Sequence, residues 1–306
     1  MIEPIKPPLC CLVLDFFLHG DLPHNEWHTV WHGALGNTLS HVAPSLFTLL
    51  YGEGENSTRL YSLVPPLPNY PRLRVTLLGD ACHAGLDITE IIKAMGRQGL
   101  RGQDRHRFTI DWAQYGSSDP MPYYYGQVDE MIGAPEAHRI TREFFNYDMG
   151  QRNNLRFSTI TPLILKEDNG VMAGPPSFSG LVRRLLGRIS QVAHATGAAL
   201  PYDDGQQRDW ERQSASVVLV NQKVKKMSFS RQSKRTEQPM AFSGWEGVLD
   251  YAGPVGAFYS LFKLGENLQL GGCTAFGFGA FQTFWGKLRL EGRGTDPVWS
   301  SSSVQC

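Results

Sequence analysis

The stretch from Gly265 to Gly279 constrains the fold of this chain more than any other segment. Its sequence, GENLQLGGCTAFGFG, holds five glycines in fifteen residues and lies between two apolar segments. Glycine reaches positive φ angles and lacks a Cβ atom, so its backbone N–H groups can approach a ligand closely, phosphate groups above all. The stretch therefore predicts either a tight structural turn or a ligand-binding loop, and glycine content favours neither.

Two common nucleotide-binding motifs do not fit this stretch. A GxxxxGK[ST] phosphate loop needs a lysine and a Ser or Thr after its last glycine, but Gly279 is followed by Ala280 and Phe281. A dinucleotide fingerprint needs a third glycine where Gln282 stands. The glycine-rich stretch is thus neither of these loops.

Composition indicates a soluble globular chain with a substantial core. Of the 306 residues, 42% are hydrophobic and 19% are charged. There is no apolar run of about eighteen residues and no cleavage-like site near the N-terminus, so we expect a cytoplasmic protein with no membrane partner. The five cysteines are odd in number and form no CxxC pair, which predicts neither a zinc ribbon nor a disulfide framework.

Charge is distributed unevenly along the chain. The net charge is zero, which argues against a uniformly basic nucleic-acid-binding protein. One run nevertheless holds six basic residues and no acidic one: Lys223, Lys225, Lys226, Arg231, Lys234 and Arg235. Such a run favours local binding of a polyanion, with a solvated charged strand or loop as the alternative.

Hydrophobic periodicity in the first half predicts alternating strands and helices. We expect a buried strand over 9–18, a helix over 24–42, a strand over 72–79, a helix over 88–95 that is broken at Gly96 and Gly99, and a strand over 108–112. Residues 61–70 are expected to be a connection because three prolines interrupt them. We interpret this half as strand, helix, strand, strand, helix, strand, which is the ferredoxin-like order.

The second half repeats this order after a boundary near residue 150. An apolar run begins at 155–165, and an amphipathic helix is predicted over 177–195; then come a hairpin over 217–220 and 223–229, a strand over 244–251, a helix from Pro254, and a closing strand over 276–284. We therefore expect an α+β fold of two tandem ferredoxin-like (RRM-like) domains. The N-terminal domain is 1–150, the C-terminal domain with the glycine-rich loop is 151–292, and the tail is 293–306.

Histidines lie along the edge of the first predicted helix. His24, His28 and His32 are four residues apart, and His41 lies near the helix end. The unperturbed pKa of histidine lies near neutrality, which suits general acid or base work. The order differs from the HExxH motif of zinc proteases because Glu26 stands one place too late. A metal site on this stripe and simple packing or helix capping stay open as alternatives.

Seven segments, in their order and spacing, resemble the CRISPR-associated endoribonucleases of the RAMP superfamily, which cut precursor CRISPR RNA within its repeats. The resemblance covers most of the chain, and the glycine-rich loop before the last strand is its most specific mark. The segments are HGALGNTL (32–39), TLLGDA (76–81), IKAMGRQGLRG (92–102), FSTITPLILK (157–166), LLGRISQVAHATG (185–197), FSGWEGVLDYAG (242–253) and LGGCTAFGFGAF (270–281).

The resemblance implies a fold and a partner. Two ferredoxin-like domains would face each other and hold repeat RNA, the precursor crRNA, across the cleft and the glycine-rich loop. The basic run would lie on a hairpin of the second domain and contact phosphates, which fix the register of the RNA without reading its bases. The RNA-binding residues expected are Lys223, Lys225, Lys226, Arg231, Lys234, Arg235, Gly271, Gly272, Gly277 and Gly279.

The chemistry that the resemblance implies needs no metal or other cofactor. The 2′-OH before the scissile phosphate attacks in line and leaves a 2′,3′-cyclic phosphate and a 5′-OH. The catalytic histidine of many members lies on or just after the first helix, where this chain offers His28, His32 and His41, with His28 slightly preferred. Some members bind repeat RNA without cutting it, so a non-cleaving RNA-binding subunit of a CRISPR effector complex, with other effector subunits as partners, is the alternative.

Overall fold

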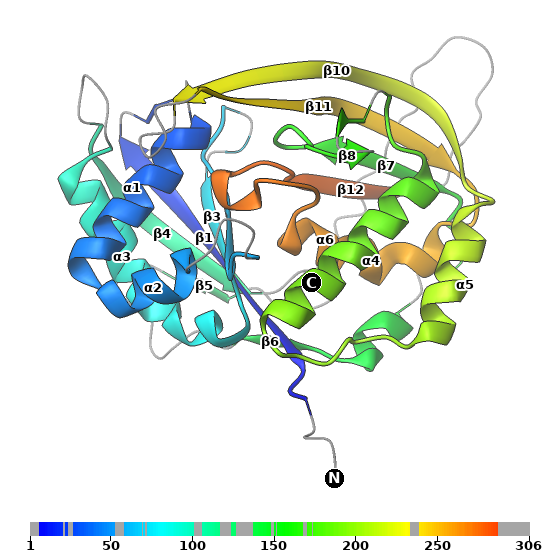
Figure 1. Ribbon diagram of the computed structural model, residues 1–306, viewed down its shortest axis with the longest axis horizontal. Coiled ribbons are helices and arrows are strands. Elements are labelled where there is room, and N and C mark those ends of the chain that lie inside the picture. The colour runs from blue at the N-terminus through cyan, green and yellow to red at the C-terminus, as the bar shows by residue number, and fades with distance from the viewer. Residues whose placement is uncertain are drawn as a thin grey trace.

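The chain folds into two α+β domains that lie beside each other (Figure 1). The computed structural model describes residues 6–20, 22–23, 27–52, 58–68, 70, 72–100, 106–116, 124–126, 137–147, 150, 152–167, 170–172, 174–232 and 239–286. The expected tail at 293–306 lies outside these residues. Within them, no helix combines the length and the apolar character that crossing a membrane requires.

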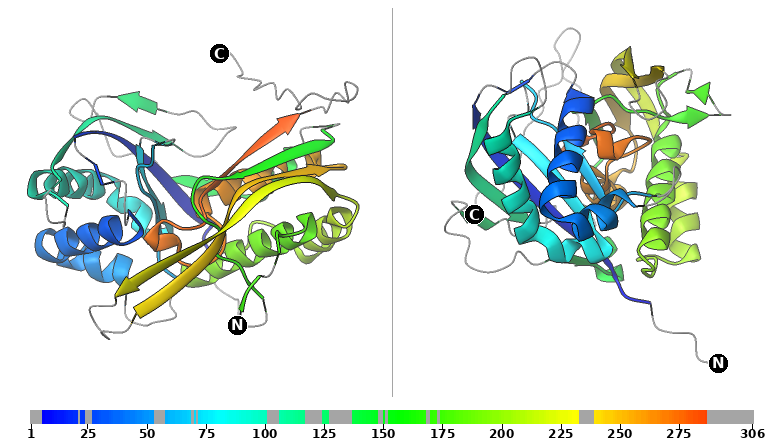
Figure 2. Two further views of the ribbon diagram at one scale, coloured as in Figure 1. Left: turned by 90° about the horizontal axis from the view of Figure 1, so that it is seen from above. Right: turned by 60° about the vertical axis from the view of Figure 1, so that its left-hand side comes forward.

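The first domain is built on an antiparallel sheet with the strand order β2-β3-β1-β4-β5. Helices cover one face of this sheet (Figure 2). The strands are β1 (Leu9–Gly20), β2 (Tyr61–Val64), β3 (Arg72–Leu78), β4 (Phe108–Gly116), β5 (Tyr124–Gly126) and β6 (His138–Ile140), which pairs with β1; the helices are α1 (Trp27–Val42), α2 (Pro44–Tyr51) and α3 (Gly85–Gln98), with short 3-10 turns at Gly79–Ala84 and Arg142–Asn146.

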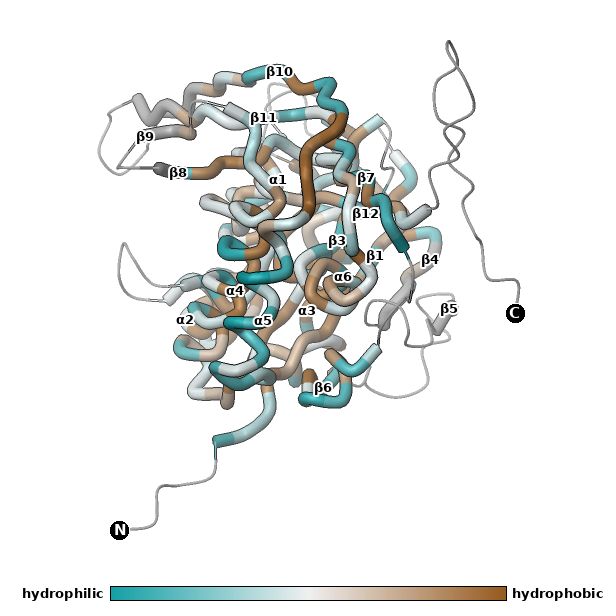
Figure 3. Tube along the Cα trace, turned by 90° about the vertical axis from the view of Figure 1, so that its right-hand side faces the viewer, coloured by the Kyte–Doolittle hydropathy of each residue, from teal (hydrophilic) through white to brown (hydrophobic). Residues whose placement is uncertain are grey.

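The second domain repeats this arrangement with the strand order β10-β11-β7-β12. Its elements are β7 (Asn154–Thr159), β8 (Lys166–Glu167), β9 (Gly170–Val171), α4 (Phe178–Ala195), α5 (Asp204–Ser214), β10 (Val218–Gln232), β11 (Pro239–Ala252), α6 (Tyr259–Leu268) and β12 (Phe281–Gly286), with 3-10 turns at Gly256–Phe258 and Thr274–Phe276. Much of α5 itself is hydrophilic (Figure 3). In chain order, the four strands that correspond are β1, β2, β3 and β4 in the first domain and β7, β10, β11 and β12 in the second. Both sheets arrange these four in the order second, third, first, fourth. The prediction of tandem ferredoxin-like domains is therefore confirmed.

Strand β1 belongs to the cores of both domains. Its apolar run alternates between two faces, because successive side chains of a strand point to opposite sides of the sheet. Leu12, Leu14 and Phe16 pack in the core that includes the buried residues of α1 and α3. Leu9 and Val13 pack in the core that includes α4 and α6. The second domain therefore covers part of the sheet face that the first domain's helices leave open.

Two predicted elements of the first domain were wrong in extent. Residues 61–70 were expected to be a connection, but Tyr61–Val64 are fully buried and pair with β3, and the prolines follow this strand. Helix α3 was expected to be broken at Gly96 and Gly99; it continues through Gly96 to Gln98 and ends there, with Gly99 as its C-cap. Gly96 is needed there for packing, because a Cβ atom would lie 2.3 Å from the carbonyl oxygen of Phe108 on β4.

Predictions for the second domain were also wrong in three places. The closing strand, expected over 276–284, is β12 at Phe281–Gly286, because the loop continues through the 3-10 turn at Thr274–Phe276. The expected hairpin of 217–220 and 223–229 is one fifteen-residue strand, β10, whose pairing with β11 is irregular between Leu219 and Asn221. The hairpin is formed by β10 and β11 instead. Gly265 lies inside α6, where α6 packs against Leu185 of α4, so the loop begins after Leu268.

Each sheet carries one ion pair between directly opposed residues of its two central strands. In the first sheet, Asp15 of β1 accepts two hydrogen bonds from Arg74 of β3, at 2.7 and 2.8 Å. In the second sheet, Asp250 of β11 accepts two from Arg156 of β7, at 2.7 and 3.0 Å. Both carboxylates are buried. The acid lies on the first strand of one repeat and on the third strand of the other.

Candidate functional site

The glycine-rich loop, residues 269–280, leaves the second domain and packs into the first. Ala275 and Phe278 belong to the same buried cluster as residues of α1, β2 and α3. The side-chain amide of Gln269 donates a hydrogen bond of 2.7 Å to the carbonyl of Leu63 on β2. The loop is the orange segment between the two domains in Figure 1, and it therefore joins the two halves of the molecule.

Three of the loop glycines are required by backbone geometry. Gly271, Gly277 and Gly279 have φ angles of 88°, 93° and 81°, a region that residues with a Cβ atom rarely adopt. The N–H groups of Gly272, Gly277 and Gly279 donate to protein carbonyls. These three N–H groups are thus directed into the protein and not toward a phosphate, and RNA contact by the loop glycines stays a prediction.

Gly279→Ala should destabilise the protein by about 2–4 kcal/mol, because it combines a positive φ with overpacking. The new Cβ atom would lie 2.0 Å from the carbonyl oxygen of Leu270. Gly272→Ala is the matched control, since its φ is not in the positive region and its nearest neighbour, Ile164 Cγ2, is 3.8 Å away. We expect it to change the unfolding free energy by less than about 0.5 kcal/mol. Urea unfolding measures both, and equal losses would contradict this account of the loop.

His32 of α1 lies where the first helix meets the glycine-rich loop. Its ring is half-buried and packs 4.0 Å from the ring of Phe276, measured between centroids. Its Nδ1 atom is 3.1 Å from the carbonyl oxygen of Ala275 in the loop and 2.9 Å from the hydroxyl oxygen of Tyr61 on β2. The hydroxyl of Tyr51, at the end of α2, donates to the backbone carbonyl of His32 at 2.7 Å. Three elements and the loop therefore fix this ring.

The contact of His32 with Ala275 fits the tautomer that carries a hydrogen on Nδ1. A carbonyl oxygen only accepts hydrogen bonds, so Nδ1 must carry a hydrogen to bond with Ala275. The Tyr61 hydroxyl donates to the oxygen of Tyr51, so its own oxygen can accept from the same Nδ1–H. In the neutral ring, Nε2 then carries the lone pair. In this tautomer, Nε2 is the nitrogen through which a histidine acts as a general base.

Tyr51 and Tyr61 remain neutral around this histidine. Burial raises the pKa of both phenols above the ordinary value of 10. The hydrogen bond from Tyr61 to Tyr51 lowers the pKa of Tyr51 and adds to the rise at Tyr61. Neither tyrosine was predicted as a site residue, and no sequence spacing links them to His32. They serve as neutral hydrogen-bonding groups and not as phenolate bases.

The other predicted histidines are placed differently. His41 is exposed at the end of α1, where its Nδ1 lies 2.7 Å from the carbonyl of Asn37 in its own helix. His28 lies on α1 one turn before His32, and its side chain is outside the described residues. His24 is also outside them. Among the described residues, no group of three or more His, Cys, Asp or Glu side chains could hold a metal ion.

The β10–β11 hairpin extends from the second domain over the first (Figures 1 and 2). Phe229 of β10 packs against Trp27 of α1 and Phe278 of the loop, with ring centroids 6.1 and 5.4 Å apart. Phe242 of β11 packs against Phe276 and Phe278 at 6.3 and 5.6 Å. The hairpin is therefore docked on both α1 and the glycine-rich loop.

The predicted basic residues lie on this hairpin as far as the structure describes them. Lys223, Lys225 and Lys226 are exposed on β10. The Nζ atom of Lys225 lies 3.8 Å from Oε1 of Glu246, which is on the paired strand β11. Arg231 is on the same strand with its side chain outside the described residues, and Lys234 and Arg235 are wholly outside them.

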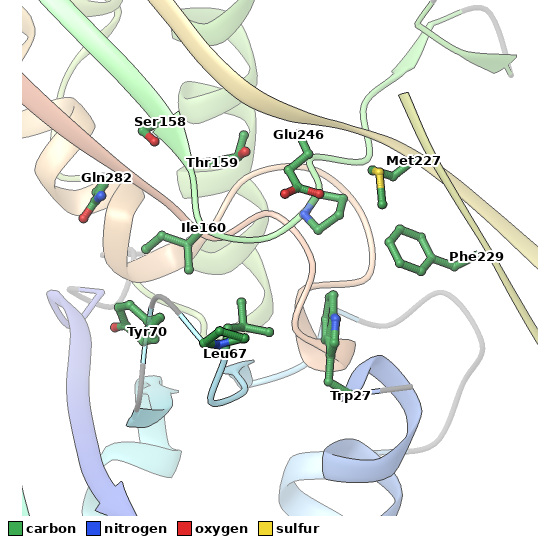
Figure 4. A pocket seen from close by; sticks show the side chains of 12 residues that line it. Trp27, Leu67, Tyr70, Ser158, Thr159, Ile160, Met227, Phe229, Glu246 and Gln282 are labelled. Atoms are coloured by element: carbon green, nitrogen blue, oxygen red, sulfur yellow. The ribbon is translucent and has the colours of Figure 1, made fainter. Parts of the chain in front are cut away.

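A pocket of about 440 Å³ opens between the two domains beside this hairpin. Figure 4 shows Trp27 and Phe229 on one side of it, with Ser158 and Gln282 on another. Apolar and polar groups share its wall, which suits a flat aromatic group with hydrogen-bonding edges such as a nucleobase. Its lining residues are Trp27, Leu67, Pro68, Tyr70, Ser158, Thr159, Ile160, Pro162, Met227, Phe229, Glu246 and Gln282.

Comparisons with known proteins agree with this geometry. Residues 157–281 match the family model described as CRISPR-associated endoribonuclease Cas6, a range that includes α4, the hairpin and the glycine-rich loop. Comparison with curated protein sequences found no match.

Solved structures of Cas6 proteins resemble the whole chain. Thermus thermophilus Cas6 (TTHB231) aligns with a TM-score of 0.57 and 17% identity over 92% of this chain and 100% of that one. The Cas6 (TTHA0078) product complex aligns with a TM-score of 0.52 and 16% identity over 90% and 98%. A partial Cas6-RT-Cas1–Cas2 complex aligns with a TM-score of 0.55 and 12% identity over 98% of this chain and 49% of that one. Residues 157–281 therefore match the sequence model of the Cas6 endoribonucleases, and the chain as a whole shares the tandem ferredoxin-like fold of the solved Cas6 structures.

Proposed function

We propose that this protein is a metal-independent endoribonuclease that binds CRISPR repeat RNA and cuts it within each repeat to give guide RNAs. The observation that carries the proposal is the setting of His32, whose Nδ1 atom lies 3.1 Å from a carbonyl oxygen of the glycine-rich loop. That loop lies within the range that matches the Cas6 endoribonucleases. A histidine oriented in this way at the junction of both domains can act on RNA that lies across them.

The reaction uses proton transfer and charge stabilisation by the protein alone. Nε2 of His32 takes the proton of a ribose 2′-OH, and the 2′-oxygen forms a bond to the adjacent phosphorus. The bond from phosphorus to the 5′-oxygen breaks, and that oxygen takes up a proton. His28 is the candidate for the group that donates this proton. It is four residues before His32, and residues four apart share one face of a helix. His41 faces its own helix end and is the weakest candidate of the three predicted histidines.

RNA binding is proposed for the surface around this histidine. The exposed lysines of β10 supply positive charge for phosphates, and the interdomain pocket supplies aromatic and polar groups for a base. The partner is repeat RNA, and subunits of CRISPR complexes are proposed as protein partners because a structure of a Cas6-RT-Cas1–Cas2 complex contains a domain of this fold.

Cleavage should proceed at full rate in EDTA, because every proposed step uses side chains. The purified protein is incubated with its cognate repeat RNA in excess EDTA, and the products are separated on a denaturing gel. We expect a single cut that leaves a 2′,3′-cyclic phosphate and a 5′-OH. Loss of cutting in EDTA would support a metal-dependent hydrolase instead. Tight binding without any cut would contradict the nuclease and leave a non-cleaving RNA-binding subunit as the function.

A further inference from the structure

A second groove, of about 430 Å³, lies between α4 and the start of the glycine-rich loop. Four of its lining residues are cationic and none is acidic: Lys166, Arg183, Arg184 and Arg188. Gly271 and Gly272 form the loop side. None of the residues predicted to catalyse the reaction lines this groove, and its cations lie outside the basic run of the hairpin. It is therefore separate from the pocket beside the hairpin.

Arg188 is the unusual member of this group. It is only 8% exposed, and its guanidinium bonds two neutral oxygens, the carbonyl of Leu268 and the hydroxyl of Thr274, both at 3.2 Å. Burial lowers its pKa to about 10, with no contribution from a neighbouring charge. The side chain therefore stays charged at neutral pH, and no carboxylate among the described residues offsets that charge. Buried charges in proteins are normally paired.

The groove places the other cations around this buried arginine. Arg184 and Arg188 are four residues apart on α4, so they share one face of the helix. The Arg184 guanidinium donates to the backbone carbonyl of Lys166, which holds it against the groove wall. Arg183 and Lys166 have exposed side chains at the rim. Several positive charges held together without a carboxylate repel one another, and a bound anion would relieve that repulsion.

We propose that this groove binds a backbone phosphate of the RNA chain that passes over the glycine-rich loop from His32. The loop connects the two sites, because Gly272 lines the groove and Ala275, three residues later, holds the histidine. Three residues span at most roughly 11 Å of chain. The identity of the ligand as RNA rests on the proposed function, whereas the affinity for a phosphate group does not. Arginines recognise phosphates through paired N–H donors. Three arginines line the groove.

A charge introduced at Gly272 tests the groove directly. The position has room for a side chain, with its nearest neighbour 3.8 Å away. Gly272→Asp and Gly272→Asn add side chains of the same size and differ in charge. We expect the Asp variant to bind repeat RNA about tenfold or more weakly than the Asn variant in fluorescence anisotropy. Equal affinities would overturn the proposal for RNA.

A second pair of variants removes positive charge from the rim. Lys166→Gln combined with Arg183→Gln changes two exposed side chains and should preserve the fold. We expect weaker RNA binding and a shallower salt dependence, by about 0.7 in the slope of log K for each lost phosphate contact. The control is Arg208→Gln combined with Arg212→Gln on α5, which removes the same charge and should change the affinity less than about twofold. An equal effect of both pairs would show a general charge effect and contradict a local site.

Inorganic pyrophosphate separates this proposal from the proposed function. It should raise the melting temperature of the wild-type protein and of the α5 control, but not that of the Lys166/Arg183 variant. If the wild type fails to bind repeat RNA, the nuclease proposal fails and the pyrophosphate result still decides the anion site. Pyrophosphate binding with RNA affinity unchanged in both sets of variants would identify a site for free phosphate compounds and overturn the RNA assignment. Absence of both effects would overturn the site itself.

Discussion

His32→Gln should slow the cleavage of bound repeat RNA by about 10²–10⁴-fold, the usual contribution of a general acid or base. Glutamine keeps an N–H group that can donate to the carbonyl of Ala275. Its amide cannot act as a general acid or base near neutral pH. The dissociation constant for uncut RNA should change less than about threefold. Single-turnover kinetics with protein in excess, together with an equilibrium binding curve, separate the two quantities.

The matched control is His194→Gln, which makes the same substitution at the exposed end of α4. Its cleavage rate should equal that of the wild type. A full rate in His32→Gln, with a large loss in His28→Gln or His41→Gln, would show that the catalytic histidine is misassigned. A rise in the dissociation constant equal to the loss of rate would indicate that His32 holds the RNA or the interface without moving a proton.

Replacing Lys223, Lys225 and Lys226 together by alanine should weaken the binding of repeat RNA by about a hundredfold at low salt. The slope of log K against log salt should fall by about 2 if each lysine neutralises one phosphate of a single strand. All three side chains are exposed, so the fold should persist. The cleavage rate of fully bound RNA should stay unchanged, because these side chains lie outside the His32 cluster. Anisotropy titrations at several salt concentrations measure the affinity and the slope.

The control for the lysine variant removes three positive charges elsewhere, by combining Lys93→Ala on α3 with Arg208→Ala and Arg212→Ala on α5. If this control loses as much affinity and as much slope as the hairpin variant, the effect comes from net charge and the hairpin is no specific RNA contact.

Local patterns were sufficient to predict most of the fold. The helix over 177–195 follows from its apolar spacing, and the structure adds that Ser177 caps its first turn by accepting from the N–H of Gly180. The repeated element order predicted two ferredoxin-like domains because each half carries the same periodicity. The missed strand β2 shows the limit, since its four residues are stabilised by pairing with β3 while the prolines that follow dominate the local signal.

The candidate site was only partly predictable. The sequence places three histidines on or near one helix with a slight preference for His28, and what distinguishes His32 is a carbonyl 243 residues away and two tyrosines from other elements. The loop glycines were recognised, but their conformational role is visible only in the φ angles and in the close approach of Leu270 and Pro65. The anion groove depends on the burial of Arg188, which sequence cannot report.

The ion pairs of the two sheets have the acid and the base on opposite strands: Asp15 is on the first strand of its repeat, whereas Asp250 is on the third strand of the other. This difference disfavours the mispairing of strands in a chain with two similar halves. If strand β1 paired with β11 at the corresponding register, Asp15 would face Asp250, and β7 paired with β3 would place Arg156 against Arg74. Like charges held opposite each other in a sheet are destabilising. Each strand therefore finds an opposite charge only within its own repeat, so the same residues that stabilise each sheet also discriminate against exchange of strands between the two halves.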